Sequence, residues 1–282
     1  MLPTPDTSHV PYSRVYEPAE DSFLLLDTLS SSSETSFLSS RFQSQSQSSQ
    51  SSPQPPCPLV LELGPGSGVV LAFLTAQSVP IFSRPDVLTL GIDINWFACS
   101  STNQTVALAA ANSTSTSPSS SSSSSSNSTS FSKFQGTIQA DLISCLRPHQ
   151  VDVLVFNPPY VPTDQGELPA GLPKGLEQGG AATTATTTFE QDSALLALSY
   201  AGGRDGMEVT DRVIDALPEV LSDRGVAYIL LCAGNKPEEV KSRIRDGLGG
   251  GDSVGKWKAE TVGTSGRQAG WEKLQIVRIW RE

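Results

Sequence analysis

The sequence is poor in positive charge. It has 19 Lys and Arg residues against 29 Asp and Glu, which gives a formal net charge of -10 and a pI near 4.7. Non-specific binding to a polyanion draws on clustered basic side chains. The composition therefore disfavours direct binding to nucleic acid and favours a protein as substrate or partner.

Closely spaced cysteines and long apolar runs are also missing. The four cysteines form no Cys-x-x-Cys pair, and the chain has only two His, so we expect structural cysteines in a reducing compartment and no bound metal. The N-terminus has no apolar signal core, and no apolar run approaches the roughly 20 residues of a membrane helix. We expect no membrane association and a cytoplasmic location, with the nucleus as a second candidate.

Two low-complexity tracts interrupt the chain. Residues from about 30 to 56 are rich in Ser, Gln and Pro, and residues 113–130 are dominated by Ser. With few apolar side chains to bury, both are expected to be insertions without folded structure. The rest is long enough for one α/β domain, so we predict a single domain over residues 1–282.

The most informative stretch is residues 151–160, an apolar strand pattern that stops at Asn157-Pro158-Pro159-Tyr160. Proline lacks an N-H and disfavours the α region in the residue before it, so the strand cannot continue through two prolines. The sequence predicts a stiff elbow at the carboxyl end of a strand, which presents one amide and one aromatic ring.

A second pattern predicts a nucleotide site. The apolar residues Leu59–Leu63 run into Gly64-Pro65-Gly66-Ser67-Gly68 and then into a helical pattern, while Asp93 closes the next strand 25 residues after Gly68. Glycines let the backbone approach a ligand, and an acid at this spacing binds ribose hydroxyls in nucleotide-binding folds. A tight turn without a ligand is the alternative.

Strand and helix patterns alternate along the remaining chain. Strands are expected at 136–142, which carries Asp141 near its end, and at 225–232, 257–262 and 272–280; helices are expected at 95–112, 207–221 and 237–248. Residues 161–188 show no clear period and form either a loop over the site or a disordered segment. This order predicts a doubly wound sheet with its ligand at the carboxyl ends of the early strands.

These motifs together resemble the class I S-adenosylmethionine-dependent methyltransferases of the HemK-like glutamine N5 type. The resemblance implies a Rossmann-like, seven-stranded, mostly parallel sheet with an antiparallel C-terminal strand. Residues 15–27, 201–206 and 265–270 are similar to the eukaryotic members, which modify the glutamine of the Gly-Gly-Gln loop in the class I translation release factor. One departure is Trp96, where family members often have proline, and it puts the start of the next helix in doubt.

The resemblance also implies roles for individual residues. The catalytic set is Asn157, Pro158, Pro159 and Tyr160: Asn157 and the Pro158 carbonyl accept the two N-H groups of the target amide, and Tyr160 packs on its plane. The implied contacts with S-adenosylmethionine are Asp21, Glu62, Gly64, Gly66, Gly68, Asp93, Asp141, Leu142 and Asn157. Among them, Asp93 binds the ribose hydroxyls, and Asp141 with the Leu142 backbone binds the adenine edge.

A partner is implied by the same family. Its eukaryotic members form a heterodimer with a small zinc-binding activator subunit that pairs with the sheet edge, and the strand at 136–142 is the expected edge. Four aromatic residues near it are candidates for an apolar patch, although core packing is an equal reading: Trp96, Phe97, Phe131 and Phe134. The substrate implied is the release factor, with the factor's GTPase partner as a further candidate.

Other functions stay open at this point. The acceptor could be an adenine amine or a protein lysine, although the acidic charge opposes DNA, and a charged, non-planar lysine suits an amide-gripping motif poorly. The chain could also be a non-catalytic nucleotide-binding module or a scaffold that uses its serine tracts. The intact residues Asn157 to Tyr160 favour catalysis.

Overall fold

The computed structural model describes residues 2–42, 56–115, 133–164, 188–248, 256–266 and 273–282. In these residues the strands form one seven-stranded sheet in the order β3-β2-β1-β4-β5-β7-β6. The first five strands pair in parallel, and β7 is antiparallel to both neighbours. The predicted fold class is confirmed. The strands are β1 Leu59–Leu63, β2 Leu88–Asp93, β3 Lys133–Gln139, β4 Val151–Phe156, β5 Leu221–Cys232, β6 Trp257–Thr264 and β7 Leu274–Arg281.

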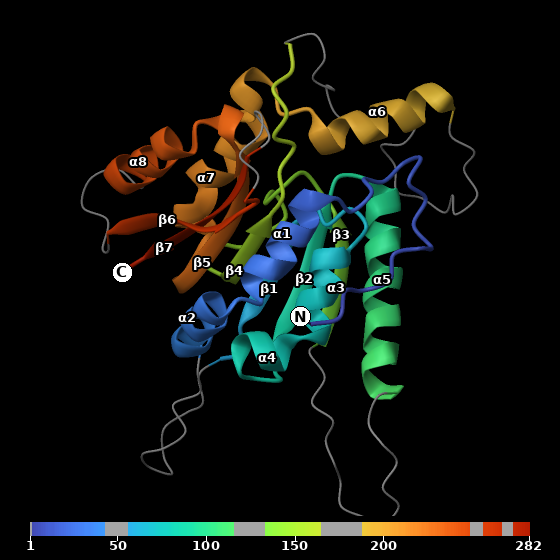
Figure 1. Ribbon diagram of the computed structural model, residues 1–282, viewed down its shortest axis with the longest axis horizontal. Coiled ribbons are helices and arrows are strands. Elements are labelled where there is room, and N and C mark those ends of the chain that lie inside the picture. The colour runs from blue at the N-terminus through green and yellow to red at the C-terminus, as the bar shows by residue number, and fades with distance from the viewer. Residues whose placement is uncertain (1, 43–55, 116–132, 165–187, 249–255, 267–272) are drawn as a thin grey trace, which may run out of the picture.

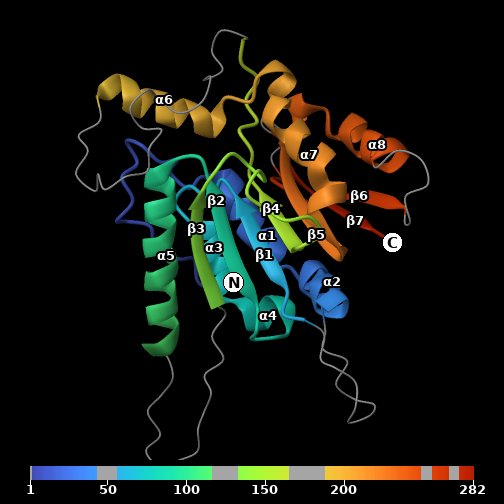
Figure 2. The same ribbon diagram turned by 180° about the vertical axis from the view of Figure 1, so that it is seen from behind.

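Helices cover both faces of the sheet, so two hydrophobic cores form, one on each side (Figures 1 and 2). One face carries α1 Glu20–Leu29, α2 Ser32–Phe42, α3 Val69–Ala76, α4 Ser78–Phe82 and α5 Trp96–Ser115. The other carries α7 Glu208–Val220 and α8 Pro237–Gly247, and α6 Phe189–Tyr200 lies across the end of the sheet in both views. None of the helices in the described ranges is long and apolar enough to span a membrane.

The central strand β4 shows why the sequence pattern was readable. All six of its residues are buried. From Val153 on, beyond an irregularity in the pairing with β5, its side chains alternate between the two cores, as expected for a parallel strand that is covered on both faces. The one charged member, Asp152, accepts hydrogen bonds from the backbone N-H of Leu59 and from the Arg224 guanidinium, at 3.0 and 2.8 Å. These bonds compensate the burial of its charge.

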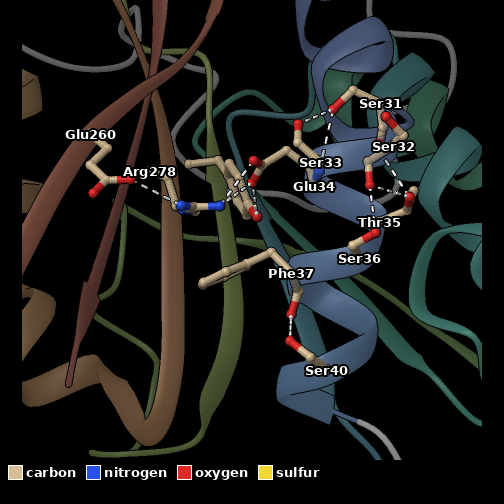
Figure 3. A network of polar contacts seen from close by, with 11 residues as sticks. Ser31, Ser32, Ser33, Glu34, Thr35, Ser36, Phe37, Ser40, Glu260 and Arg278 are labelled. Carbon is tan, nitrogen blue, oxygen red and sulfur yellow. Dashed lines mark hydrogen bonds and ion pairs between the residues drawn. The ribbon is translucent and has the colours of Figure 1, made fainter.

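The prediction that residues 30–56 lack folded structure is wrong for α2. Leu38 and Phe42 are fully buried in one core, and Glu34 is 1% exposed. Glu34 binds Arg278 of β7 through both carboxylate oxygens, at 2.9 and 3.0 Å (Figure 3). It also accepts a hydrogen bond from the Tyr228 hydroxyl at 2.8 Å. A serine-rich helix is thus held on the sheet by one acid and two apolar anchors.

Replacing Glu34 by Ala is expected to lower the free energy of unfolding by about 3 kcal/mol, because the nearly buried Arg278 would keep only the exposed Glu260 as its ion-pair partner and the buried Tyr228 hydroxyl would lose its acceptor. Arg278 also lies over the Phe37 ring, 3.9 Å from its centroid, which holds the cation in place. Urea unfolding followed by circular dichroism measures the loss. Ser40→Ala, on the exposed side of the same helix, is the control and should change the value by less than about 0.5 kcal/mol. Equal losses in both variants would contradict the role of Glu34.

Several other boundaries differ from the sequence prediction, and β5, for example, starts at Leu221 instead of 225. Strand β3 ends at Gln139 instead of 142, so Asp141 and Leu142 lie in the turn after the strand; β3 is nevertheless an edge, as expected. Helix α5 starts at Trp96 without the usual proline, because the Asn95 side chain accepts a hydrogen bond from the Phe97 N-H at 3.0 Å. It also runs to Ser115 and so enters the second serine tract.

Some predictions fall on segments outside the described residues. These are the rest of both tracts, most of the 161–188 segment, Phe131 and residues 267–270.

Candidate active site

A cavity of about 310 Å³ opens at the carboxyl ends of β1, β2 and β4. Parallel strands place their carboxyl ends at one edge of the sheet, and ligands bind there in open α/β folds. Eight of the predicted site residues line this cavity, namely Glu62, Gly64, Gly66, Asp93, Asp141, Leu142, Asn157 and Pro159. Asp21, Gly68, Pro158 and Tyr160 are not among the lining residues, and their positions are described below.

The glycine turn is shaped by left-handed backbone angles. Gly64, Gly66 and Gly68 have φ values of 60°, 55° and 79°, a region that side chains with a Cβ rarely adopt. Asp93 braces the turn, because its Oδ2 accepts a hydrogen bond from the Gly66 N-H at 3.2 Å. Gly68 lets α3 approach α5, since a Cβ there would lie 2.6 Å from Thr102 Cα. Its position thus supports helix packing behind the turn.

Glu62 is a buried acid with an unused oxygen. It is 2% exposed, and its Oε2 has no hydrogen-bond partner among the described residues. Burial, opposed by a backbone hydrogen bond from Leu71 and reinforced by the charge of Asp93, raises the pKa of Glu62 to about 8. A ligand ammonium group is the natural partner for such a carboxylate, so the cavity fits the amino acid end of a cofactor.

Asp93 is the second buried acid of the cavity, at 8% exposure. Burial raises its pKa to about 6, although hydrogen bonds from the backbone of Asn95, Gly66 and Ile94 act in the opposite direction. Its Oδ1 accepts the Asn95 N-H at 2.8 Å. Asp93 can therefore hold the turn and still offer a carboxylate to ligand hydroxyls.

The elbow after β4 places an amide at the cavity wall. Asn157 lines the cavity, and its Oδ1 is buried without a hydrogen-bond partner in the part of the chain that the structure describes. A buried acceptor left unpaired costs about 1 to 3 kcal/mol, so this oxygen is suited to accept an N-H group from a bound molecule. Of the two prolines that follow, Pro159 lines the cavity and Pro158 does not.

Tyr160 and Asp21 meet behind the cavity wall. Asp21 is 3% exposed, and its Oδ2 accepts hydrogen bonds from the hydroxyls of Tyr16 and Tyr160, at 3.1 and 3.5 Å. Tyr16 lines the cavity. Asp21 therefore connects the N-terminal segment to the elbow.

Asp141 and Leu142 form the wall beyond β2. Asp141 pairs with Arg212 of α7 at 2.6 Å, and both side chains are about half exposed. Leu142 has a φ of 48°, which is uncommon for a residue other than glycine and often marks a functional site. The resemblance assigns this wall to the adenine edge, and that role stays a prediction.

Two walls of the cavity were missed by the sequence analysis. One is the N-terminal segment with Arg14, and the other is α6, which contributes Leu195, Leu198 and Ser199. Arg14 joins them, because its Nε lies 3.0 Å from Asp192 Oδ1 of α6. The signal for α6 was present in the sequence: Thr188 and Gln191 form a capping box at its start.

The site combines two features with different uses. Glu62 and Asp93 lie near the glycine turn and can bind the cationic and hydroxyl groups of a nucleotide-linked amino acid. Asn157 stands at the end of the neighbouring strand and offers a neutral acceptor, with no strong base in the elbow. Such a site can orient an amino or amide group toward a reactive centre.

Comparison with known proteins agrees with this geometry. No protein-family model matches the sequence. The chain is 31% identical to methyltransferase HEMK2 of Mus musculus over 99% of this chain and 96% of the relative. It is 29% identical to the eRF1 methyltransferase catalytic subunit mtq2 of Schizosaccharomyces pombe, over 100% and 96%.

An archaeal protein is similar at a greater distance. The putative protein N5-glutamine methyltransferase MJ0928 of Methanocaldococcus jannaschii is 24% identical, over 96% of this chain and 93% of its own length. The likeness to the mouse protein extends over nearly the whole of both chains. With this coverage, and with the glycine turn and the elbow both placed at one cavity, the chain belongs to the HEMK2 family of methyltransferases.

Proposed function

We propose that this protein transfers a methyl group from S-adenosylmethionine to the side-chain amide nitrogen of the glutamine in the Gly-Gly-Gln loop of the eukaryotic class I release factor. The observation that carries the proposal is the buried, unpartnered Oδ1 of Asn157 at the cavity wall. The names of two relatives support this substrate and acceptor, because the fission yeast relative is named an eRF1 methyltransferase and the archaeal relative a putative protein N5-glutamine methyltransferase.

The cofactor would be held by the residues around the glycine turn. Glu62 has the charge and the free oxygen to bind the cofactor's ammonium group, while Asp93 would bind the ribose hydroxyls and Asp141 with Leu142 the adenine edge. When bound, S-adenosylmethionine supplies a methyl group made electrophilic by its attachment to a sulfonium. The protein then has to bring the acceptor nitrogen into line with that methyl.

An amide nitrogen is a poor nucleophile, because its lone pair is delocalised into the carbonyl. The elbow offers acceptors and no strong base, so its contribution is orientation. Asn157 Oδ1 and the Pro158 carbonyl would each accept one N-H of the glutamine amide, which turns the nitrogen toward the methyl group and favours its pyramidal form. The proton can leave after transfer, when the nitrogen has become acidic.

The two rival acceptors fit this site less well. A lysine ammonium is tetrahedral and charged, and two fixed neutral acceptors suit a planar NH2 group better. An adenine amine is planar, but the chain has a formal net charge of -10, which opposes a nucleic-acid substrate. Glutamine is therefore the preferred acceptor.

The partner would be a small zinc-binding activator subunit that pairs with the edge strand β3. Support comes from the place of β3 at the end of the sheet formed by the described strands and from exposed apolar side chains on β3 and the neighbouring α5, where Trp96 is 41% and Ile138 40% exposed. Unpaired strand edges and apolar patches favour association with another chain.

Mass spectrometry of the release factor tests the proposal. The factor is incubated with the enzyme and labelled S-adenosylmethionine, with and without the activator subunit. We expect one methyl group on the glutamine of the Gly-Gly-Gln loop, formed fastest with the activator present. Label found only on lysine, or only on added nucleic acid, would overturn the choice of acceptor, and full activity of a stable enzyme without the activator would contradict the heterodimer.

A further inference from the structure

The catalytic elbow has few backbone hydrogen bonds of its own. Pro158 and Pro159 have no N-H to donate, and the pairing of β4 with β1 and β5 ends at Phe156. A segment without such backbone bonds can move by tenths of an ångström unless other contacts hold it, and a movement of that size is enough to misplace an orienting group. Other parts of the chain must therefore hold it.

Asn235 supplies one such support from the end of β5. It is 2% exposed, and its Nδ2 donates to the Tyr160 carbonyl at 3.0 Å and to the Asp205 carbonyl at 2.8 Å. Its Oδ1 accepts the Cys232 N-H at 2.7 Å. Only this orientation of the amide satisfies two acceptors and one donor, so its three contacts define its position.

The glycine-rich segment at 202–206 packs on the same piece of backbone. A Cβ added at Gly202 would overlap the Pro159 carbonyl, and one at Gly206 would overlap the Tyr160 carbonyl and crowd Asn235 Nδ2. Backbone bonds complete the contact, because Gly202 N-H donates to the Val161 carbonyl at 2.9 Å. Absence of side chains at these two positions lets Asn235 reach Tyr160.

We propose that Asn235 is a positioning residue for methyl transfer: by holding the Tyr160 carbonyl from behind, it sets the orientation of Asn157 toward the acceptor amide. Asn235 does not line the cavity, so it acts through the elbow and not on the substrate. The inference rests on the proposed function, since it deepens the account of how Asn157 works.

The test uses Asn235→Asp in the full chain with its activator. Aspartate has nearly the same shape and still accepts the Cys232 N-H, but it donates nothing and would set a negative charge against two carbonyl oxygens. We expect kcat to fall about 10- to 100-fold, with the dissociation constant of S-adenosylhomocysteine unchanged within about twofold. Asn235→Gln keeps both N-H donors on a longer side chain. We expect it to lose kcat as well, with a smaller loss of stability than Asn235→Asp.

Tyr228→Phe is the matched control, because it also removes a buried side-chain hydrogen bond, from the Tyr228 hydroxyl to Glu34 of α2. Tyr228 pairs with Val155 of β4, but its hydroxyl bonds α2 and not the elbow, so the variant leaves the elbow's own hydrogen bonds in place. It should lose stability and keep kcat. The rate of amide hydrogen exchange in a peptide covering 156–163 measures the mobility of the elbow without any substrate. This rate should rise in both Asn235 variants and not in the control.

The outcomes separate the two proposals. If the wild-type enzyme methylates the glutamine while folded Asn235→Asp and Asn235→Gln keep full kcat and unchanged exchange, the positioning role is wrong. An equal loss of kcat in Tyr228→Phe would also overturn it. If the wild type forms no methylglutamine, the proposed function fails, while faster exchange of the elbow in the variants would still support Asn235 as its anchor.

Discussion

Replacing Asn157 by Ala is expected to lower kcat for methylation of the release factor by at least about 100-fold, the usual effect of removing one oriented polar group at a reacting centre. The enzyme would still fold, because Asn157 Oδ1 has no hydrogen-bond partner within the described residues and its loss breaks no side-chain bond of that atom. Affinity for the cofactor should fall by no more than about tenfold. Single-turnover kinetics with labelled cofactor measure the rate, and calorimetry measures the affinity.

Gln150→Ala is the control for this variant. Gln150 also carries an amide, is exposed, and precedes β4 at the opposite end of the strand, so its loss should leave kcat within about twofold. Full activity in Asn157→Ala, with cofactor binding intact, would remove the elbow from the mechanism. Loss of cofactor binding alone would move Asn157 to a purely cofactor-binding role.

Replacing Glu62 by Gln is expected to stabilise the free protein at alkaline pH and to weaken cofactor binding at the same time. The folded pKa of about 8 lies above the ordinary value of 4.5. The stability from this group is therefore complete below about pH 4.5 and is lost as pH rises through 8. The whole shift corresponds to at most about 5 kcal/mol, and glutamine, which does not titrate, would not show this loss.

The affinity for the cofactor is expected to fall in Glu62→Gln, whereas the stability of the free protein at alkaline pH is expected to rise. A charged ammonium gains a charge-assisted bond from an ionised Glu62, and glutamine cannot replace that charge, so affinity should fall about 10- to 100-fold. Since most Glu62 carries a proton below pH 8, binding at pH 7 should release close to one proton in the wild type and none through this group in Glu62→Gln. Calorimetry in buffers of different ionisation enthalpy measures that proton.

Thermal unfolding at pH 6 and pH 9 supplies the stability comparison. Glu239→Gln, an exposed acid on α8, is the control and should change neither the pH dependence of unfolding nor the affinity. If wild type and Glu62→Gln lose stability in parallel between these two pH values, the raised pKa of Glu62 is wrong. If the two proteins bind S-adenosylhomocysteine equally, Glu62 does not hold its ammonium group.

The strands around the site were predictable from local sequence. In β1 and β4 every residue but the first of β1 is buried, so the apolar runs were unbroken and their ends were marked by glycine or proline. The same local signals placed Gly64, Gly66, Asp93 and Asn157 near one edge of the sheet. These four residues do line one cavity, although the roles implied for them stay predictions.

Segments held by distant contacts were not predictable in this way. Helix α2 is nearly without an apolar stripe, and its place depends on Glu34 meeting Tyr228 and Arg278, which lie 194 and 244 residues away in the chain. Composition alone therefore suggested an unfolded tract. Helix α6 had a readable capping box, but only the folded chain shows that it covers the cavity and that Asp192 binds Arg14.

Local sequence was thus sufficient for the fold class, the glycine turn and the elbow, because a strand's burial and a proline's missing N-H act within a few residues. The walls of the cavity, the unpaired oxygens of Glu62 and Asn157, and the support of Tyr160 by Asn235 depend on tertiary contacts. Burial and hydrogen-bond partners are properties of groups that meet in space, and the residues that meet at this cavity come from segments as far apart in the chain as Arg14 and Arg212.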